Sequence, residues 1–184
     1  MRNILSFFWE ISKIVIIALV IVVPIRYFLF QPFIVRGASM EPNFHSNDYL
    51  IIDEISYRFW EPQRGEVVVF KYPKAPTQRY IKRIVGLPGE TIEIKDGQVF
   101  ISKGGEAQVL DESSYLTESV KTPGDVSLAL EESEYFVLGD NRSFSSDSRY
   151  WGSLPENYII GRVFFRAWPP QAFAKIALPI YQTP

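Results

Sequence analysis

The feature that most constrains this 184-residue chain is an apolar segment near its N-terminus. Residues 14–25 form an uninterrupted apolar run, and residues 7–30 are dominated by apolar side chains. The inner run is too short to span a bilayer, which takes about 20 residues, but the longer segment is sufficient. Lys13 and Arg26 stand near its ends, where long cationic side chains can reach the lipid headgroups. The segment therefore predicts a membrane anchor over residues 1–30.

A buried core helix and a cleaved signal peptide are the two other interpretations of this segment. A cleaved signal peptide ends at a small-residue site of the Ala-x-Ala kind. No such site follows the apolar run, since the chain passes directly into Gln31-Pro32-Phe33. An uncleaved anchor is therefore favoured. Its orientation is barely decided by charge, because cationic residues stand on both sides of the apolar run.

Beyond the anchor, the hydrophobic pattern changes to that of short β-strands. Apolar and β-branched runs punctuated by proline and glycine are typical of strands. We expect strands at residues 34–35, 49–52, 66–70, 80–87, 91–94, 98–101, 135–138 and 158–165. Asp96-Gly97 predicts a tight hairpin turn, and the polar residues 104–123 predict an exposed excursion. No helical pattern of convincing length follows the anchor, so residues 31–184 are expected to form one mainly β domain.

Composition excludes several classes of function. The net charge is −2 and no basic face accumulates, which argues against a nucleic-acid partner. The chain has no cysteine, so it has no thiol nucleophile, disulfide or thiolate metal site. Its one histidine, His45, follows Ser39 by six residues in a polar turn, a poor position for a preorganised catalytic base. We expect neither a metal nor another cofactor.

One serine and one lysine stand in stretches that suit each other chemically. Ser39 lies between small residues and a Met-x-Pro turn, and Lys82 lies inside an apolar run. On a strand, Lys82 shares a face with Tyr80 and Ile84, so it loses solvation and its charged form is disfavoured. A neutral lysine can take the proton of a serine hydroxyl. The two stretches together predict a serine–lysine dyad.

A third informative stretch covers residues 139–152. Glycine, aspartate, asparagine and serine are common in connecting loops, which is the simplest explanation of this stretch. However, it also contains two acid–arginine combinations, several hydroxyls and an aromatic pair within 14 residues. That density favours a supporting role in which hydroxyls and ion pairs orient a buried base.

In their order along the chain, four stretches resemble the motifs of bacterial type I signal peptidase, the membrane-anchored serine protease that removes signal peptides from exported proteins. The four stretches are Gly37–Pro42, Arg64–Phe70, Tyr80–Glu90 and Gly139–Gly152. The resemblance implies a compact β domain of antiparallel sheets, preceded by one transmembrane helix. It also implies cleavage after Ala-x-Ala-type sites, at the cytoplasmic membrane, with the catalytic domain on the extracytoplasmic side.

The resemblance assigns roles to individual residues as well. Ser39 is expected to be the nucleophile and Lys82 the general base. The supporting residues are expected to be Ser145 as a hydrogen-bond partner of the lysine, the ion pair of Asp147 with Arg149, and the pair of Asp140 with Arg83. The backbone N–H of Ser39 would donate to the oxyanion, whereas Gly37 stands where many members carry a second, side-chain hydroxyl. The substrate pockets are expected to be lined by Phe33, Val35, Met40, Phe44, Val69, Tyr80 and Ile81.

Two alternatives remain beside this interpretation. The first is a relative with the same serine–lysine β fold, such as a conjugation-pilin peptidase or a self-cleaving repressor, but a repressor needs a DNA-binding region and no anchor. The second is an inactive, membrane-tethered β module that binds exported chains without cutting them. The intact pair of Ser39 and Lys82 favours the enzyme. Signal peptides of exported preproteins and the lipid bilayer are therefore the expected partners.

Overall fold

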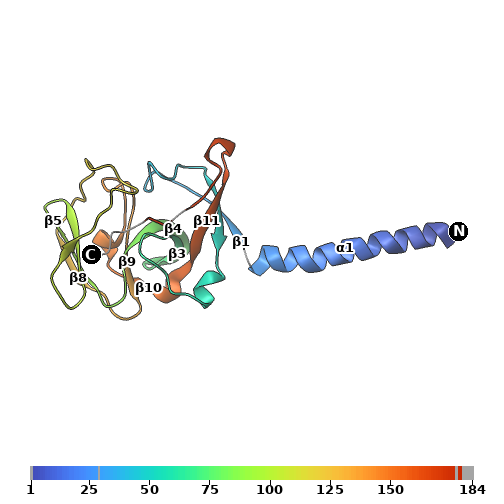
Figure 1. The fold of residues 1–184 in the computed structure, drawn as a ribbon, viewed down its shortest axis with the longest axis horizontal. Helices are drawn as coiled ribbons and strands as arrows, with labels where there is room; N and C mark the ends of the chain where they lie inside the picture. The colour runs from blue at the N-terminus through green and yellow to red at the C-terminus, as the bar shows by residue number, and fades with distance from the viewer. Residues whose placement is uncertain (1, 29, 177, 180–184) are drawn as a thin grey trace.

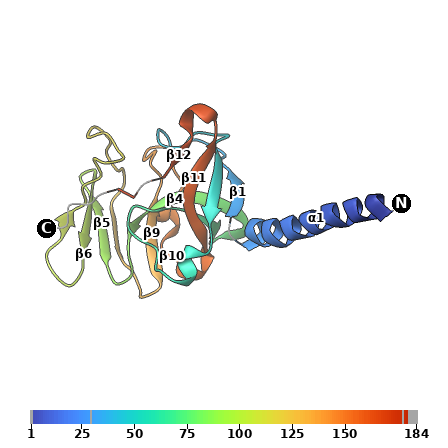
Figure 2. The same cartoon turned by 45° about the vertical axis from the view of Figure 1, so that its right-hand side comes forward.

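The computed structural model describes residues 2–28, 30–176 and 178–179, with the backbone alone described for residues 2–6, 21–28 and 30. Its first element is helix α1 (Arg2–Phe28). Figures 1 and 2 show this helix standing away from a body made of β-strands, which contains nearly all of the remaining chain. We call this part the β body. The mainly β, antiparallel fold expected from the sequence is confirmed.

The helix α1 coincides with most of the apolar segment. Along residues 7–20 every described side chain is exposed, and Phe8, Trp9 and Ile14 each expose about two thirds of their surface. Among the residues that the structure describes, no helix is both long and apolar enough to cross a membrane. The anchor predicted over residues 1–30 is thus not confirmed, and its residues 1 and 29 lie outside the described part.

The larger sheet of the β body is antiparallel throughout. In order across the sheet, its strands are β1 (Phe30–Ile34), β2 (Tyr49–Asp53), β11 (Ile159–Trp168), β3 (Val67–Tyr72), β4 (Ala75–Gly86), β9 (Glu134–Leu138) and β10 (Leu154–Pro155), with β12 (Ala174–Lys175) paired to β11. The central strand β3 has four consecutive buried residues, because both of its faces are covered. Val67 and Val69 join one apolar cluster, and Val68 and Phe70 join another.

A second, smaller sheet lies at the end of the β body opposite α1 (Figures 1 and 2). Its strands, in order, are β7 (Gln108–Val109), β6 (Gln98–Ser102), β5 (Thr91–Lys95) and β8 (Val126–Ala129). The predicted hairpin turn joins β5 to β6, and both Asp96 and Gly97 have positive φ, as a two-residue turn of this kind requires. Strand β4 passes so close to Ile92 of this sheet that a Cβ on Gly86 would lie 2.7 Å from its side chain.

Several local features differ from the sequence-based expectation. The first strand begins four residues earlier than predicted, and the short strands β7, β8, β10 and β12 were not predicted. A single-turn helix, α2 (Ser148–Trp151), and three 3-10 turns, η1 (Ser56–Arg58), η2 (Glu156–Tyr158) and η3 (Pro170–Ala172), also went unpredicted. Elements of two to four residues are too short to show periodicity, so a pattern cannot reveal them.

The excursion predicted at residues 104–123 is exposed over only part of its length. Residues 103–109 and 117–121 are exposed, but Leu116 and Thr122 are buried against the body. Most of the segment is thus exposed, and Leu116 and Thr122 are the buried exceptions. Isolated buried residues in a polar stretch follow from tertiary contacts, which composition does not encode.

Candidate active site

The predicted dyad comes together in the structure. Ser39 lies in the turn that follows β1, and Lys82 lies near the middle of β4. The Nζ atom of Lys82 is 2.7 Å from the Oγ atom of Ser39, which is hydrogen-bond distance. Lys82 also donates to the backbone carbonyl of Ile81 at 2.8 Å. The serine and the lysine predicted to be nucleophile and base, 43 residues apart in sequence, are thus in direct contact.

Burial alters the acid–base chemistry of Lys82. Only 3% of this residue is exposed, its cross-strand neighbour is the fully buried Val68, and the Tyr80 ring lies 5.6 Å from Nζ. Desolvation lowers the pKa of Lys82 from 10.5 to about 8, against the opposing pull of the Asp147 and Asp140 charges. A substantial fraction of the amine is therefore neutral in mildly alkaline solution and can accept the Ser39 proton.

The predicted pair of Arg83 and Asp140 is present and buried. Two parallel contacts join them, Nε to Oδ1 at 2.8 Å and Nη2 to Oδ2 at 2.6 Å. The side-chain amide of Asn43 also donates to Oδ2 of Asp140 at 2.8 Å. Since Asn43 belongs to the turn after Ser39, the ion pair ties that turn to the strand that carries Lys82.

The predicted pair of Asp147 and Arg149 is present as well. It too has two contacts, each of 2.8 Å, and Asp147 is fully buried. Asp147 accepts from the backbone N–H of Gly139 at 3.0 Å and caps the helix α2. Arg149 donates to the carbonyl of Arg142 at 2.7 Å. These bonds close residues 139–149 into a compact loop beside the dyad.

Ser145 is buried, but its hydroxyl has no hydrogen-bond partner among the described residues. The hydrogen bond expected between Ser145 and Lys82 is not formed. The amine of Lys82 instead contacts Ser39 and the carbonyl of Ile81. The hydroxyl packs against Gly139, where an added Cβ would lie 2.1 Å from the Ser145 Oγ and 2.5 Å from the Ser39 carbonyl oxygen. Only glycine fits at position 139.

The sequence reasoning did not single out Asn141, which holds the backbone around the nucleophile. Its N–H donates to the carbonyl of Ser39 at 3.1 Å, and its side-chain amide donates to the carbonyl of Ala38 at 3.1 Å. The stretch containing Asn141 was noted, but only the folded chain brings it to Ser39. A similar brace from β11 is formed by Arg166, which donates to the Asn43 carbonyl and lies 3.4 Å from Asp48.

The dyad lies in a cleft of about 530 Å³ bordered by β1 and β4. Three of the predicted pocket residues, Phe33, Tyr80 and Ile81, line it. The other four do not: Val35, Met40, Phe44 and Val69 are 0–2% exposed and belong to the apolar cluster in which Ile81 is also packed. These four residues pack in the core behind the cleft. The sequence could not distinguish residues that line the cleft from residues that pack behind it, because both kinds are apolar.

Gly37 borders the cleft two residues before Ser39. Its φ of +87° lies in the left-handed region, which favours glycine, although a Cβ there would meet nothing within 4 Å. The backbone conformation, not the available space, therefore accounts for glycine at this position, and no side chain from it points at the dyad.

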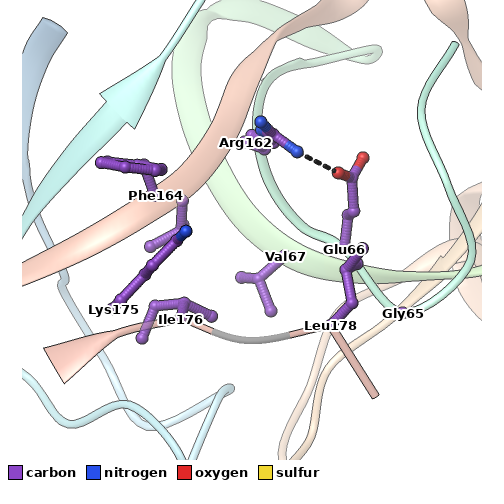
Figure 3. Close-up of a pocket in the computed structure, with 9 residues that line it drawn as sticks. Gly65, Glu66, Val67, Arg162, Phe164, Lys175, Ile176 and Leu178 are labelled. Atoms are coloured by element: carbon purple, nitrogen blue, oxygen red, sulfur yellow. Dashed lines mark hydrogen bonds and ion pairs between the residues drawn. The ribbon is translucent and has the colours of Figure 1, made fainter. Parts of the chain in front are cut away.

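A second cavity, of about 350 Å³, lies where β11 and the segment after it pass over β3 (Figure 3). Arg162 and Glu66 face each other across it with an ion pair of 3.0 Å, and Lys175, Ile176 and Leu178 form the other side. The second oxygen of Glu66 accepts from the Tyr57 hydroxyl at 2.7 Å. The carboxylate in this cavity is thus fully engaged within the protein.

Comparison of this chain with known proteins shows which family it belongs to. Residues 8–168 match the family model described as "Signal peptidase, peptidase S26". "Probable signal peptidase I-2" of Synechocystis sp. is 38% identical over 171 residues, which cover 87% of this chain and 73% of the relative.

Two further proteins, each named "Signal peptidase I", are 34% identical to the chain. The one from Leptolyngbya laminosa is matched over 91% of this chain and 83% of its own length, and the one from Bacillus amyloliquefaciens over 88% and 86%. A crystal structure of a signal peptidase I from Enterococcus faecalis is also similar, with 32% identity, a TM-score of 0.47, and coverage of 56% of this chain and 97% of that one. The chain, with its serine–lysine pair inside the matched residues, belongs to the signal peptidase family, peptidase S26.

Proposed function

We propose that Ser39 is the nucleophile and Lys82 the general base with which this serine endopeptidase removes signal peptides from exported preproteins. The observation that carries the proposal is the 2.7 Å contact between Ser39 Oγ and Lys82 Nζ, made inside a cleft by a lysine that is almost fully buried. A solvated lysine would stay protonated near neutral pH and could not act as a base.

The reaction follows from this geometry. Lys82 Nζ takes the proton of Ser39 as Oγ attacks the scissile carbonyl, and the backbone N–H of Ser39 donates to the resulting oxyanion. Protonated Lys82 then gives its proton to the departing amine of the mature chain, which leaves an ester on Ser39. The lysine, again neutral, takes a proton from water as the water oxygen attacks that ester. Protonated Lys82 then returns this proton to Ser39 Oγ as the ester bond breaks and the signal peptide leaves. Proton transfers balance over the two steps.

The substrate is proposed to bind as an extended strand between β1 and β4. Among the residues that the structure describes, β1 pairs only with β2, and residues 75–82 of β4 pair only with β3, so each strand has a free edge. An extended peptide can satisfy such edges with backbone hydrogen bonds. The apolar walls contributed by Phe33, Tyr80 and Ile81 leave room for small side chains, in agreement with cleavage after Ala-x-Ala-type sites.

The helix α1 is proposed to attach the enzyme to the cytoplasmic membrane as a single-pass anchor, with the β body on the extracytoplasmic side. What supports this is the exposure of apolar side chains over residues 7–20, on a helix that stands clear of the β body (Figure 1). An apolar surface of this size is unfavourable in water and is typical of contact with lipid or another protein. The corresponding division is an anchor at residues 1–30 and a catalytic domain at residues 31–184.

A preprotein assay tests the reaction. The purified full-length chain in detergent is incubated with a preprotein that carries one Ala-x-Ala site, and the new N-terminus is determined by mass spectrometry. We expect one cut directly after the site for the wild type and none for Ser39→Ala, Lys82→Met or Lys82→Arg. Cleavage by Lys82→Met would show that another group is the base.

A separate measurement tests the location. In spheroplasts, an external protease should digest the β body, while α1 stays protected by the membrane. Digestion only after lysis would place the catalytic domain on the cytoplasmic side and contradict the proposed topology.

A further inference from the structure

The arginines of the β body divide into two groups, according to whether they meet a carboxylate. Six form ion pairs with Asp or Glu, and they are Arg64, Arg83, Arg142, Arg149, Arg162 and Arg166. For the other three, Arg36, Arg58 and Arg79, no carboxylate of the described residues lies within ion-pair distance. Arginine usually bonds carboxylate or phosphate groups through its planar fork, so these three are free to bind an external anion.

Two of these three arginines lie in the active-site cleft. Arg36 and Arg79 line the same cavity as Ser39 and Lys82, and both side chains are exposed. No aspartate or glutamate is among the described residues that line this cavity. The carboxylates of Asp140 and Asp147, which lie nearby, are already bonded to arginines. The cleft is thus positive although the whole chain carries a net charge of −2.

A contact across the cleft positions Arg79. Its Nη1 atom lies 3.3 Å from the side-chain oxygen of Gln31, so the guanidinium reaches from β4 to β1. Burial raises the pKa of Glu54, and the charge of Arg79 opposes this effect, so the two groups interact at a distance. They do not form an ion pair among the described residues. The guanidinium of Arg79 is therefore not held by a carboxylate and is available where an extended substrate would lie.

We propose that this cleft selects substrates that carry a carboxylate close to the cleavage site, and that Arg36 and Arg79 bind that carboxylate. The inference rests on the proposed function, because it specifies which preproteins the Ser39–Lys82 site prefers. Both arginines are exposed and their ion pairs are screened, so the preference is moderate. We expect Glu to be favoured over neutral Gln by roughly 3- to 10-fold, and over Lys by more, since Lys adds repulsion.

The test is a charge scan of one peptide substrate. The parent peptide carries an Ala-x-Ala site and no charged residue from five positions before the cut to three after it. Glu, Gln or Lys is placed singly at each position that tolerates substitution, and kcat/KM is measured with the full-length enzyme in detergent at low and high salt. At one or more positions the order should be Glu, then Gln, then Lys, and the differences should shrink at high salt.

Substitutions in the enzyme assign the effect to the arginines. The Glu-to-Gln ratio should fall toward one in Arg36→Gln or Arg79→Gln, and Arg79→Glu should reverse the order so that Lys is favoured. Lys95→Gln changes the net charge equally on the exposed far strand β5, and it should leave the ratio as in the wild type.

The possible outcomes separate this inference from the proposed function. Cleavage of the parent peptide with equal rates for Glu and Gln at every position would refute the carboxylate preference and leave the proposed function intact. A preference that survives in both arginine variants would also refute it. If neither the scanned peptides nor a preprotein is cut at all, the proposed function fails and this inference fails with it.

Discussion

Removing the amine of Lys82 should change how the stability of the protein depends on pH. In the folded chain the pKa of Lys82 is about 8, and its ordinary value, which applies to the unfolded chain, is 10.5. Between these values the unfolded chain binds more protons than the folded chain, so the free energy of unfolding rises with pH. Below pH 8 both states are protonated, and the folded state carries the full cost of a buried charge.

The size of this effect follows from the two pKa values. Their difference is 10.5 minus about 8, and each pH unit corresponds to about 1.4 kcal/mol, so the buried charge costs about 3 kcal/mol at pH 7 and below. Lys82→Met has no such group. The stability of Lys82→Met relative to the wild type should therefore fall by about 3 kcal/mol as the pH rises from 7 to 10.5, and it should be greatest at the acidic end.

Urea unfolding at several pH values between 6.5 and 10.5, followed by tryptophan fluorescence, measures this difference. Other titrating groups are common to both proteins and cancel in the comparison. Lys95→Met, which removes an exposed lysine on β5, serves as the control and should give a flat difference. A flat difference for Lys82→Met as well would mean that Lys82 is not neutralised by burial. The mechanism also requires wild-type kcat/KM to rise along an acid limb with a midpoint near pH 8.

Three further substitutions test the surroundings of the dyad. Ser145→Ala removes a buried hydroxyl that has no partner among the described residues, so thermal unfolding should show no loss of stability. If the hydroxyl positions Lys82 during the reaction, kcat should fall by roughly 10- to 1,000-fold, whereas a wild-type kcat would assign it no role. Gly139→Ala places a methyl group against the Ser39 carbonyl and the Ser145 hydroxyl, and should abolish cleavage even where circular dichroism shows a folded β body. Glu112→Ala strands the buried charge of Arg142 and should lower the free energy of unfolding by about 3–5 kcal/mol in urea titrations; a loss below 1 kcal/mol would show that the pair is dispensable.

The sequence predicted the parts of this site that depend on residue type. An apolar strand around Lys82 implied a desolvated amine, and in the structure this amine is buried, which lowers its pKa. The pairing of Arg83 with Asp140 also holds. What the sequence could not provide is orientation within an apolar set: Phe33 forms a wall of the cleft whereas Met40 is part of the core. That distinction depends on where each side chain lies in the folded chain, which no pattern of residues records.

Backbone contacts were equally beyond the sequence. Asparagine in a Gly-Asp-Asn run is an ordinary turn residue, and only the folded chain brings Asn141 against Ser39 and Ala38. In the same way, only the folded chain shows that the Ser145 hydroxyl has no hydrogen-bond partner among the described residues. Roles that depend on such distances need coordinates.

The partly buried excursion determines where the chain can accept an insertion. Gly104 and Gly105 are exposed, and a Cβ at either position would touch nothing, so a tag or a small reporter domain placed between them should leave the protease intact. Further along the same segment the chain is bound to the loop of residues 139–149, because Glu112 and Thr122 both bond the guanidinium of Arg142. The segment of residues 104–123 thus accepts an insertion at Gly104–Gly105 but not near Glu112 or Thr122. An insertion near either of these residues would break the bonds to Arg142 and disable the enzyme, although neither residue belongs to the Ser39–Lys82 pair.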